Sequence, residues 1–289
     1  MKAPELGYKR AESVGQVIEL LASYGDDARV LAGGQSLMPT LNMRLSKPKL
    51  LVDINQLNAL KGISFEDGIV RVGALARHAE IMRSTVIFEK LPLIAEAMPY
   101  VAHVAIRNRG TFGGSIALAD PAAELPACVL ALGATIVVES ARGQREIPAS
   151  DYFKGLFETE RRPDELLIEV RIPSIGMKGV HVFSELSRRQ GDFAVAGVAC
   201  AAEIDGDTIS SARLVYFASE DRPTLATNAV TAITNKVWSE GSRASVLDAL
   251  GDDLDPMENL QGSSEFKLHL QRVLTGRVLD EAIARARAR

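Results

Sequence analysis

Val30-Leu-Ala-Gly-Gly-Gln-Ser-Leu37 and Arg109-Gly-Thr-Phe-Gly-Gly-Ser-Ile116 are the stretches that decide how this chain is interpreted, because they are built alike. Each holds a Gly-Gly pair followed one or two residues later by a serine. Successive glycines let neighbouring backbone N–H groups point into one concavity, and a nearby hydroxyl suits phosphate oxygens. One such pair is commonly only a turn. Two pairs in one chain also fit a ligand whose two phosphates are held from both sides, and the residues alone leave both interpretations open.

The better-known phosphate motifs are absent from the sequence. Neither stretch continues as G-x-G-x-x-G, and no G-x-x-x-x-G-K-[ST] is present, so a Rossmann or P-loop interpretation fails. The nucleophile elbow G-x-S-x-G is missing too. Four histidines occur, none at metal-ligand spacing, and we expect each at the surface or hydrogen-bonded: His78, His103, His181 and His269. Any redox chemistry must therefore come from a bound cofactor.

Composition mainly excludes functions. The 289 residues allow about two domains, since domains run to roughly 150 residues. A net charge of -4 offers no field for nucleic acid. Two cysteines, Cys128 and Cys200, are too few for a disulfide framework, a Cys₄ zinc site or an iron–sulfur cluster. No signal-like or membrane-spanning apolar run is visible, so we expect a soluble, cytoplasmic protein.

Hydrophobic periodicity predicts three successive blocks. In the first, about 1–57, a helix is followed by two strands (13–24, 29–32 and 50–54). The second mixes strands and helices around the second glycine stretch (strands 68–74, 134–139 and 165–172; helices 78–83, 91–104 and 121–132). After a boundary at 174–179, three neighbouring strands precede a helical remainder (180–186, 194–204 and 210–217, then a helix at 265–289). The class is mixed α+β.

Several motifs in one order resemble the FAD-binding medium subunits of molybdenum hydroxylases. They are Ala32-Gly-Gly-Gln-Ser-Leu37, Ile106-Arg-Asn-Arg-Gly-Thr-Phe-Gly-Gly-Ser115, Ala119-Asp-Pro-Ala-Ala-Glu124, Glu185-Leu-Ser-Arg-Arg-Gln-Gly-Asp-Phe-Ala194 and Leu260-Gln-Gly-Ser-Ser-Glu-Phe-Lys-Leu-His269. This family includes the flavin subunits of aerobic carbon monoxide dehydrogenase, of bacterial xanthine dehydrogenases, and of quinoline, nicotine and caffeine dehydrogenases. The similarity covers essentially the whole chain.

The resemblance implies a fold with two domains. A PCMH-type, vanillyl-alcohol-oxidase-like FAD-binding domain would occupy 1–176, with lobes of about 1–57 and 58–176 and the flavin between them. A C-terminal domain of antiparallel sheet plus helices would occupy 177–289.

The resemblance also implies which residues meet the cofactor. The pyrophosphate would be held by Leu31, Ala32, Gly33, Gly34, Gln35, Ser36, Leu37, Gly110, Thr111, Gly113, Gly114 and Ser115. Glu124 matches an acidic position near the adenosine end, and Asp120 would sit by the same loop. From its sequence position alone, Asp120 is equally suited to capping a helix or to bonding a ribose hydroxyl. Leu167 matches an apolar strand position against the cofactor, and Phe193 matches a position where relatives often carry a tyrosine against the isoalloxazine ring. Asp192, beside it, would place a carboxylate at the lobe junction.

Position 35 bears on how the flavin is attached. Wider relatives attach FAD covalently through a histidine, and Gln35 cannot form that bond, so we expect non-covalent FAD. No catalytic or metal-ligating residue is expected in this chain.

The family's electron path implies partners. Electrons pass from a molybdopterin–molybdenum subunit through a small subunit with two [2Fe–2S] clusters to FAD, and then to NAD⁺, oxygen or another acceptor. This chain cannot ligate a cluster, so those centres would reside on other polypeptides of a heterotrimer, or of a dimer of heterotrimers. Substrate hydroxylation would belong to the molybdenum subunit. Two alternatives remain open: a free-standing flavin oxidoreductase, and a non-catalytic nucleotide-binding assembly protein.

Overall fold

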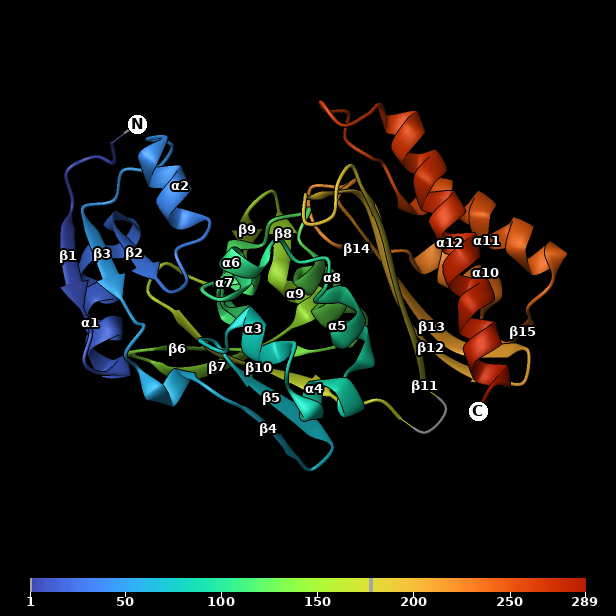
Figure 1. Cartoon of the computed structure of the whole chain (residues 1–289), viewed down its shortest axis with the longest axis horizontal. Coiled ribbons are helices and arrows are strands. Elements are labelled where there is room, and N and C mark those ends of the chain that lie inside the picture. Colours follow the sequence, from blue (N-terminus) through green and yellow to red (C-terminus); the bar gives the residue numbers. More distant parts are fainter. Residues whose placement is uncertain (1, 177–178) are drawn as a thin grey trace.

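Three units follow one another along residues 2–176 and 179–289, the parts of the chain that the computed structural model describes (Figure 1). The first lobe, residues 2–57, is a three-stranded parallel sheet in the order β1-β3-β2 with short helices. Its elements are β1 (Gly7–Arg10), α1 (Val14–Tyr24), η1 (Gly25–Asp27), β2 (Ala28–Leu31), α2 (Leu37–Asn42) and β3 (Leu50–Asp53).

Local chemistry explains the first helix. The Ser13 side chain accepts the Gln16 N–H and caps α1, and Gly25 ends it with a φ of +50° that glycine adopts without strain. The predicted strands at 29–32 and 50–54 are present as β2 and β3. The prediction missed β1, because all four of its residues are exposed and show no alternating apolar pattern.

The second lobe, residues 58–176, is built on a five-stranded antiparallel sheet in the order β4-β5-β10-β6-β7. Its strands are β4 (Ile63–Glu66), β5 (Ile69–Gly73), β6 (Thr135–Ser140), β7 (Gly143–Pro148) and β10 (Leu166–Pro173), with a small hairpin of β8 (Phe153–Gly155) and β9 (Glu158–Thr159). Its helices are η2 (Asn58–Leu60), α3 (His78–Ile81), α4 (Thr85–Lys90), α5 (Pro92–Ala97), α6 (Val104–Arg107), α7 (Phe112–Leu118), α8 (Glu124–Ala131) and α9 (Ala149–Tyr152).

Two sequence predictions for this lobe were wrong. The single helix expected at 91–104 is α5 followed by a break, because Ala102 takes a left-handed φ of +46° before α6 begins at Val104. The second glycine stretch is the start of α7 rather than a loop, because the Thr111 side chain accepts the Gly114 N–H and caps that helix.

The C-terminal unit, residues 179–289, is a sheet in the order β11-β12-β13-β14 with three helices on one face (Figure 1). Its elements are β11 (Gly179–Ser187), β12 (Ala194–Asp205), β13 (Thr208–Phe217), β14 (Thr224–Leu225), α10 (Thr227–Ile233), β15 (Lys236–Val237), α11 (Glu240–Asp253) and α12 (Ser264–Arg287). The expected domain boundary between residues 176 and 177 falls at Met177 and Lys178, which lie outside the described residues. No helix of the described chain is long and apolar enough to span a bilayer.

The core joins the second lobe to the C-terminal sheet. One face of that sheet packs in the same hydrophobic cluster as α5 and α8, with Phe183 stacked on Phe217 at 5.6 Å between ring centroids. The other face packs against α10, α11 and α12. Arg285 near the end of α12 donates to Glu96 on α5 and to the carbonyl of His181 on β11. These contacts hold the C-terminal sheet against the second lobe.

Candidate functional site

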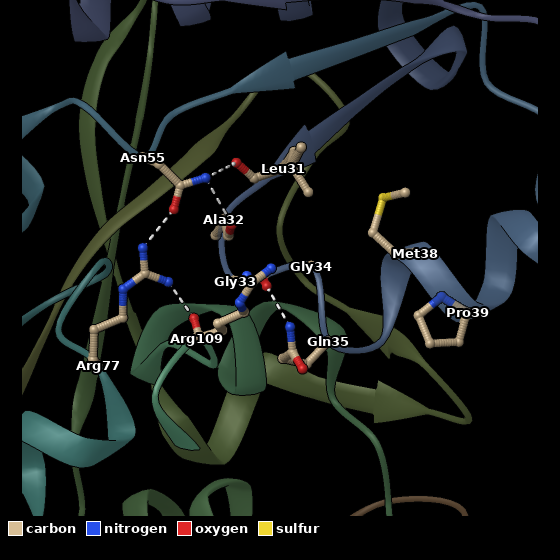
Figure 2. A pocket seen from close by; sticks show the side chains of 10 residues that line it. All are labelled: Leu31, Ala32, Gly33, Gly34, Gln35, Met38, Pro39, Asn55, Arg77 and Arg109. Carbon is tan, nitrogen blue, oxygen red and sulfur yellow. Dashed lines mark hydrogen bonds between the residues drawn. The ribbon is translucent and has the colours of Figure 1, made fainter. Parts of the chain in front are cut away.

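A cavity of about 920 Å³ lies between the two lobes and beneath the loop after β11. This volume is within the range of ~300–1,000 Å³ that small-molecule and cofactor sites occupy. Every residue that the sequence predicted at the site lines it, except Leu31. Leu31 lines a smaller cavity of about 530 Å³ on the glycine pair at 33–34, together with Asn55, Arg77 and Arg109 (Figure 2).

The first glycine segment, residues 33–37, offers free donors to the larger cavity. None of its five backbone N–H groups has a hydrogen-bond partner in the described chain. Gly34 has a φ of +70°, which glycine tolerates, and the Gln35 side chain donates back to the Gly33 carbonyl at 2.9 Å (Figure 2). Successive unpartnered N–H groups in a concave turn favour anionic oxygens.

The second glycine segment, residues 110–115, differs from the first. Gly113 donates to Ala74 O at 3.0 Å, Gly114 to Thr111 Oγ1 at 3.1 Å and Ser115 to Thr111 O at 3.1 Å. The N–H of Gly110 is also taken, by Ile106 O at 2.7 Å. Thr111 alone in this segment has an N–H without a partner among the described residues. The two segments are therefore unequal, and most of the free donors belong to the first.

Arg77 and Asn55 tie the two segments together. Asn55 donates to Ala32 O at 2.8 Å, and Arg77 donates to Asn55 Oδ1 at 2.6 Å and to the Arg109 carbonyl (Figure 2). Sequence analysis missed both residues. A usable signal existed for Asn55: β2 and β3 are parallel, so residues just beyond their ends, Ala32 and Asn55, must lie together.

Asp120 and Glu124 bring carboxylates to the cavity. Asp120 accepts the Ala122 N–H at 2.9 Å, so it closes a turn, and the residue that caps α8 is Ala123. The helix-capping alternative for Asp120 was therefore wrong. Burial, with Asp120 nearby, raises the pKa of Glu124 to about 7, and burial also raises the pKa of Asp120.

Glu185 on β11, which is not among the residues that line the cavity, is a third carboxyl group near enough to Glu124 to feel its charge, and the sequence did not single it out. Both of its carboxyl oxygens are buried with no hydrogen-bond partner in the described chain. Burial, then the charge of Glu124, raises the pKa of Glu185 to about 8. Burial therefore favours the protonated form of both carboxyl groups.

The rim of the cavity carries an aromatic side chain. Phe193, 57% exposed, and Asp192 follow Gly191, whose backbone lies so close to His103 that a Cβ there would stand 2.6 Å from the imidazole Nδ1. Leu167 on β10 is buried in the opposite part of the lining. The loop after β11 thus meets the 102–103 turn at the cavity rim.

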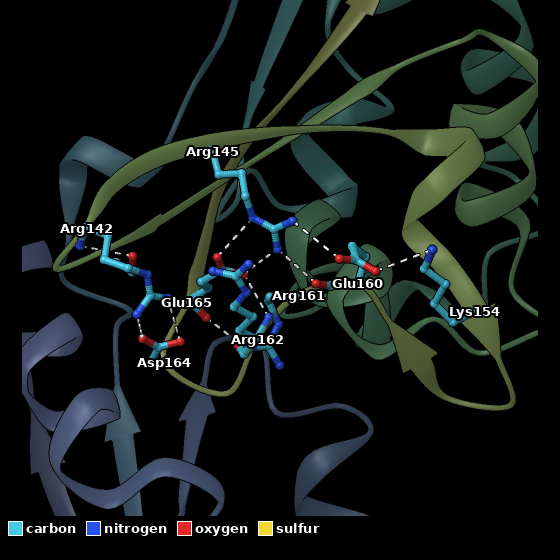
Figure 3. Close-up of polar contacts among 9 residues, drawn as sticks. Arg142, Arg145, Lys154, Glu160, Arg161, Arg162, Asp164 and Glu165 are labelled. Carbon is cyan, nitrogen blue, oxygen red and sulfur yellow. Dashed lines mark hydrogen bonds and ion pairs between the residues drawn. The ribbon is translucent and has the colours of Figure 1, made fainter.

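A charged network beside β8 and β9 holds one wall of the cavity (Figure 3). Glu165, 2% exposed, accepts two hydrogen bonds from Arg145 at 3.1 and 2.8 Å and the Arg162 N–H at 2.8 Å. Burial acts to raise its pKa, but these donors hold it below its ordinary value. Arg161 donates to the Glu165 carbonyl at 2.8 Å and, like Lys154, lines the cavity. Sequence analysis found no member of this network.

His78 is buried rather than at the surface: its ring is 5% exposed, and a hydrogen bond with the Thr111 backbone acts on it. His181 is buried as well, whereas His103 and His269 are exposed as expected. In the part of the chain that the structure covers, no three His, Cys, Asp or Glu side chains gather as a metal site.

These features fit the flavin dinucleotide that the resemblance implies. Free N–H groups at residues 33–37 suit a pyrophosphate, carboxyl groups at Asp120 and Glu124 suit sugar hydroxyls, and the exposed ring of Phe193 suits a flat heterocycle.

Comparisons with known proteins agree in both sequence and structure. Residues 4–175 match the family described as the FAD binding domain in molybdopterin dehydrogenase, and residues 181–282 match the CO dehydrogenase flavoprotein C-terminal domain. The 6-hydroxypseudooxynicotine dehydrogenase complex subunit alpha of Paenarthrobacter nicotinovorans is 39% identical over 288 residues, covering 99% of this chain and 97% of that protein.

Two solved structures superpose over nearly the whole chain. A chain of the carbon monoxide dehydrogenase from Hydrogenophaga pseudoflava has a TM-score of 0.96 at 33% identity, with 99% of each chain covered. A chain of quinoline 2-oxidoreductase from Pseudomonas putida 86 has a TM-score of 0.93 at 36% identity, again with 99% of each chain covered.

Proposed function

This chain belongs to the FAD-binding medium subunits of molybdenum hydroxylases, and from that premise we propose that it binds FAD non-covalently in the cavity between its lobes and passes electrons from a [2Fe–2S] subunit to an external acceptor. The resemblance and the α+β fold class expected from the sequence are confirmed, as is membership of a dehydrogenase. The electron path, the partners and the contact residues are the proposal.

The observation that carries the proposal is the first glycine segment. Five consecutive N–H groups at residues 33–37 face a cavity of about 920 Å³ without a partner in the described chain. These residues are only partly buried, and successive unpartnered N–H groups in such a concave turn favour an anionic ligand. The pyrophosphate of FAD has the matching charge, and the cavity extends from there to the carboxylates and to Phe193.

The chain's own residues would bind and orient the FAD. Asp120 and Glu124 would accept hydrogen bonds from sugar hydroxyls, Leu167 would pack against the cofactor, and Asp192 and Phe193 would border the flavin ring. When bound, FAD supplies chemistry that accepts and releases one or two electrons. No general base is required of this chain, since hydroxylation would take place on the molybdenum subunit.

We infer partner subunits because this chain cannot ligate an iron–sulfur cluster. Cys128 and Cys200 are both buried and unpaired, and burial raises the pKa of each thiol. The [2Fe–2S] clusters and the molybdopterin would therefore be held by a small and a large subunit, in a heterotrimer or a pair of heterotrimers.

Co-expression tests the proposal. The chain is produced alone and with its neighbouring genes, and the purified material is analysed for bound flavin, iron, molybdenum and co-purifying chains. We expect a yellow chain alone, and with its neighbours a complex whose iron and molybdenum are lost when this chain is removed by affinity depletion. A yellow chain that turns over a substrate alone supports a free-standing oxidoreductase instead. A colourless chain that binds no FAD contradicts the proposal.

A further inference from the structure

Arg77 reaches both glycine segments with one side chain, and it does so across the two lobes (Figure 2). Its guanidinium donates to Asn55 Oδ1 in the first lobe at 2.6 Å and to the Arg109 carbonyl in the second. Asn55 in turn donates to Ala32 O at 2.8 Å. Ala32 directly precedes the first glycine segment, and Arg109 directly precedes the second. The side chains of Arg77 and Asn55 therefore link the peptide groups from which both segments start.

This link fixes the direction of those peptide groups. A trans peptide points its N–H away from its carbonyl oxygen, so the bond from Asn55 to Ala32 O turns the free N–H of Gly33 to the opposite side. The contact between Gly33 and Gly110 brings the segments together, but neither glycine has a side chain that could hold their orientation. The orientation comes from the hydrogen bonds to the carbonyls of residues 32 and 109.

Asn55 can form this link with only one orientation of its amide. Its Nδ2 faces two acceptors, Ala32 O and Asp53 Oδ1, each at 2.8 Å. An amide turned the other way would place its oxygen against both acceptors, so Oδ1 is left to accept from Arg77. The Tyr8 hydroxyl donates to the other carboxylate oxygen of Asp53 at 2.6 Å. A chain of hydrogen bonds therefore runs from β1 to the junction of the lobes.

The backbone of Arg77 is anchored in the second lobe. It forms an isolated antiparallel bridge with Thr111, and the neighbouring His78 N–H donates to Gly110 O at 3.0 Å. The side chain of Arg77, by contrast, reaches into the first lobe. Arg77 and Asn55 line the smaller cavity and are not among the described residues that line the larger one. They are therefore placed to support the glycine segments from behind, away from a ligand in the larger cavity.

We propose that Arg77, acting through Asn55, is a positioning residue that aligns the two glycine segments for the pyrophosphate of FAD. The guanidinium holds the carbonyl of residue 109 directly and the carbonyl of residue 32 through the Asn55 amide. Hydrogen bonds from a charged donor are stronger than neutral ones, which suits a link across a lobe junction. The proposal rests on the proposed function, because it takes the ligand of residues 33–37 to be that pyrophosphate.

The test is a double-mutant cycle on ligand affinity. Arg77→Met removes the guanidinium but keeps an apolar stem, Asn55→Ala removes the amide, and a third variant carries both changes. Each deflavinated full-length chain is titrated with FAD and with ADP, which also carries two linked phosphates, well below its melting temperature. We expect each single change to weaken both ligands about tenfold, which corresponds to about 1.4 kcal/mol. Because the two side chains act as one link, the double variant should bind no more than about twofold more weakly than the weaker single variant.

Two further variants separate this role from a general loss of stability. Arg77→Lys keeps a cationic donor and should recover part of the affinity that Arg77→Met loses. Arg71→Met is the matched control: Arg71 on β5 donates to Glu169 at 3.1 Å and belongs to the lining of neither cavity. We expect this variant to bind FAD and ADP as the wild type does.

Wild-type affinity for FAD in Arg77→Met overturns the proposal. A loss of about a hundredfold in the double variant overturns it too, since that is the product expected of two independent effects. Equal losses in Arg71→Met and Arg77→Met would also overturn it, because they would report a general response to the loss of an arginine. If Arg77→Met does not fold, Arg77→Lys and Asn55→Ala carry the comparison. A wild-type chain that binds no FAD contradicts the proposed function itself, and that result is known before any variant is compared.

Discussion

Gly33 lies directly against the backbone of Gly110: a Cβ on residue 33 would stand 2.8 Å from the Gly110 Cα and nearer still to the Arg109 carbonyl oxygen. The two glycine segments, far apart in the sequence, therefore form one continuous surface. Gly33→Ala must push them apart, which would misplace the free N–H groups of residues 33–37. We expect at least a tenfold loss of FAD affinity, measured as flavin bound per chain after gel filtration and by titration of the deflavinated chain.

Gly15→Ala is the matched control, since residue 15 lies within α1 and a Cβ there would have no atom nearer than 3.9 Å. That change should leave flavin binding intact and stabilise the helix by about 0.5–1 kcal/mol. Full flavin content in Gly33→Ala would show that the close approach of the two segments is not needed for binding.

How far the sequence predicts the site depends on the kind of signal. Features that can be recognised in a short stretch of sequence predicted the structure correctly: Ser13 and Gly25 mark the ends of α1, and the glycine pairs identified residues that line one cavity. Features that depend on contacts between distant segments were not predicted. From the sequence, Thr111 is expected to lie in a loop, but in the structure its hydroxyl caps α7. The N–H groups of the second glycine pair are therefore hydrogen-bonded and not free for a ligand.

The residues missed at the site act across the fold. Arg77 and Asn55 join segments that lie 22 residues or more apart, and Glu165, just before β10, is held by Arg145 on β7, with β6 between the two strands. Nothing in the local sequence distinguishes these side chains from ordinary surface charges. The burial of His78 could not be predicted for the same reason, because burial is a property of packing that a lone histidine in a sequence does not reveal.

Arg145 should contribute to stability well beyond an ordinary surface charge. Its guanidinium is bound to the carboxylate of Glu165, which is 2% exposed, so Arg145→Leu leaves a buried carboxylate without its main partner. Breaking such a pair costs about 3–5 kcal/mol. We expect a loss near the lower figure, because Arg145 itself is 30% exposed, and urea unfolding of the chain measures it.

Arg142→Leu provides the comparison. The Arg142–Asp164 pair is short, at 2.7 Å, but the side chains are 55% and 28% exposed, and exposed pairs contribute about 0–1 kcal/mol. Equal losses in the two variants would mean that burial of Glu165 does not determine the strength of its pairing.

Glu185 should make the chain less stable as pH rises. Its folded-state pKa of about 8 lies above the ordinary value of 4.5, so between these pH values the folded chain keeps a proton that the unfolded chain releases. The free energy of unfolding therefore falls through this window. Glu185→Gln, which mimics the protonated form, should melt above the wild type at pH 8 and level with it near pH 4.5.

Glu124, with a pKa of about 7, titrates in the same window and will leave part of the pH dependence in that variant. Glu203→Gln on β12 serves as the control, because Glu203 is exposed. A Glu185→Gln variant whose melting temperature follows the wild type at every pH would show that this carboxyl group ionises freely in the folded chain.

Flavin should leave the chain on denaturation. Residue 35 is glutamine, which cannot form the covalent bond to flavin that a histidine can form, and its side-chain carboxamide donates to the Gly33 carbonyl at 2.9 Å. Acid precipitation of the yellow protein should leave all of the flavin in the supernatant, measured by absorbance, with a colourless pellet. Flavin fluorescence on the denatured chain in a gel would contradict the prediction and point to another attachment residue.

Phe193 should decide how the outer end of the cofactor is held. It is 57% exposed on the cavity rim, so its ring is accessible to a ligand that enters the cavity. If it stacks on the flavin ring, Phe193→Ala should weaken FAD by roughly 5–10-fold, as the loss of about 1–1.5 kcal/mol implies, and shift the flavin absorption bands. Phe193→Tyr should bind FAD as the wild type does.

Phe88→Ala is the control: Phe88 is 75% exposed on α4 and outside the cavity lining, so its substitution should change neither FAD affinity nor the flavin absorption bands. Because ADP lacks the ring, its affinity should be the same in Phe193→Ala and the wild type; a parallel loss for ADP would show that the substitution disturbs the loop after β11 rather than a stacking contact.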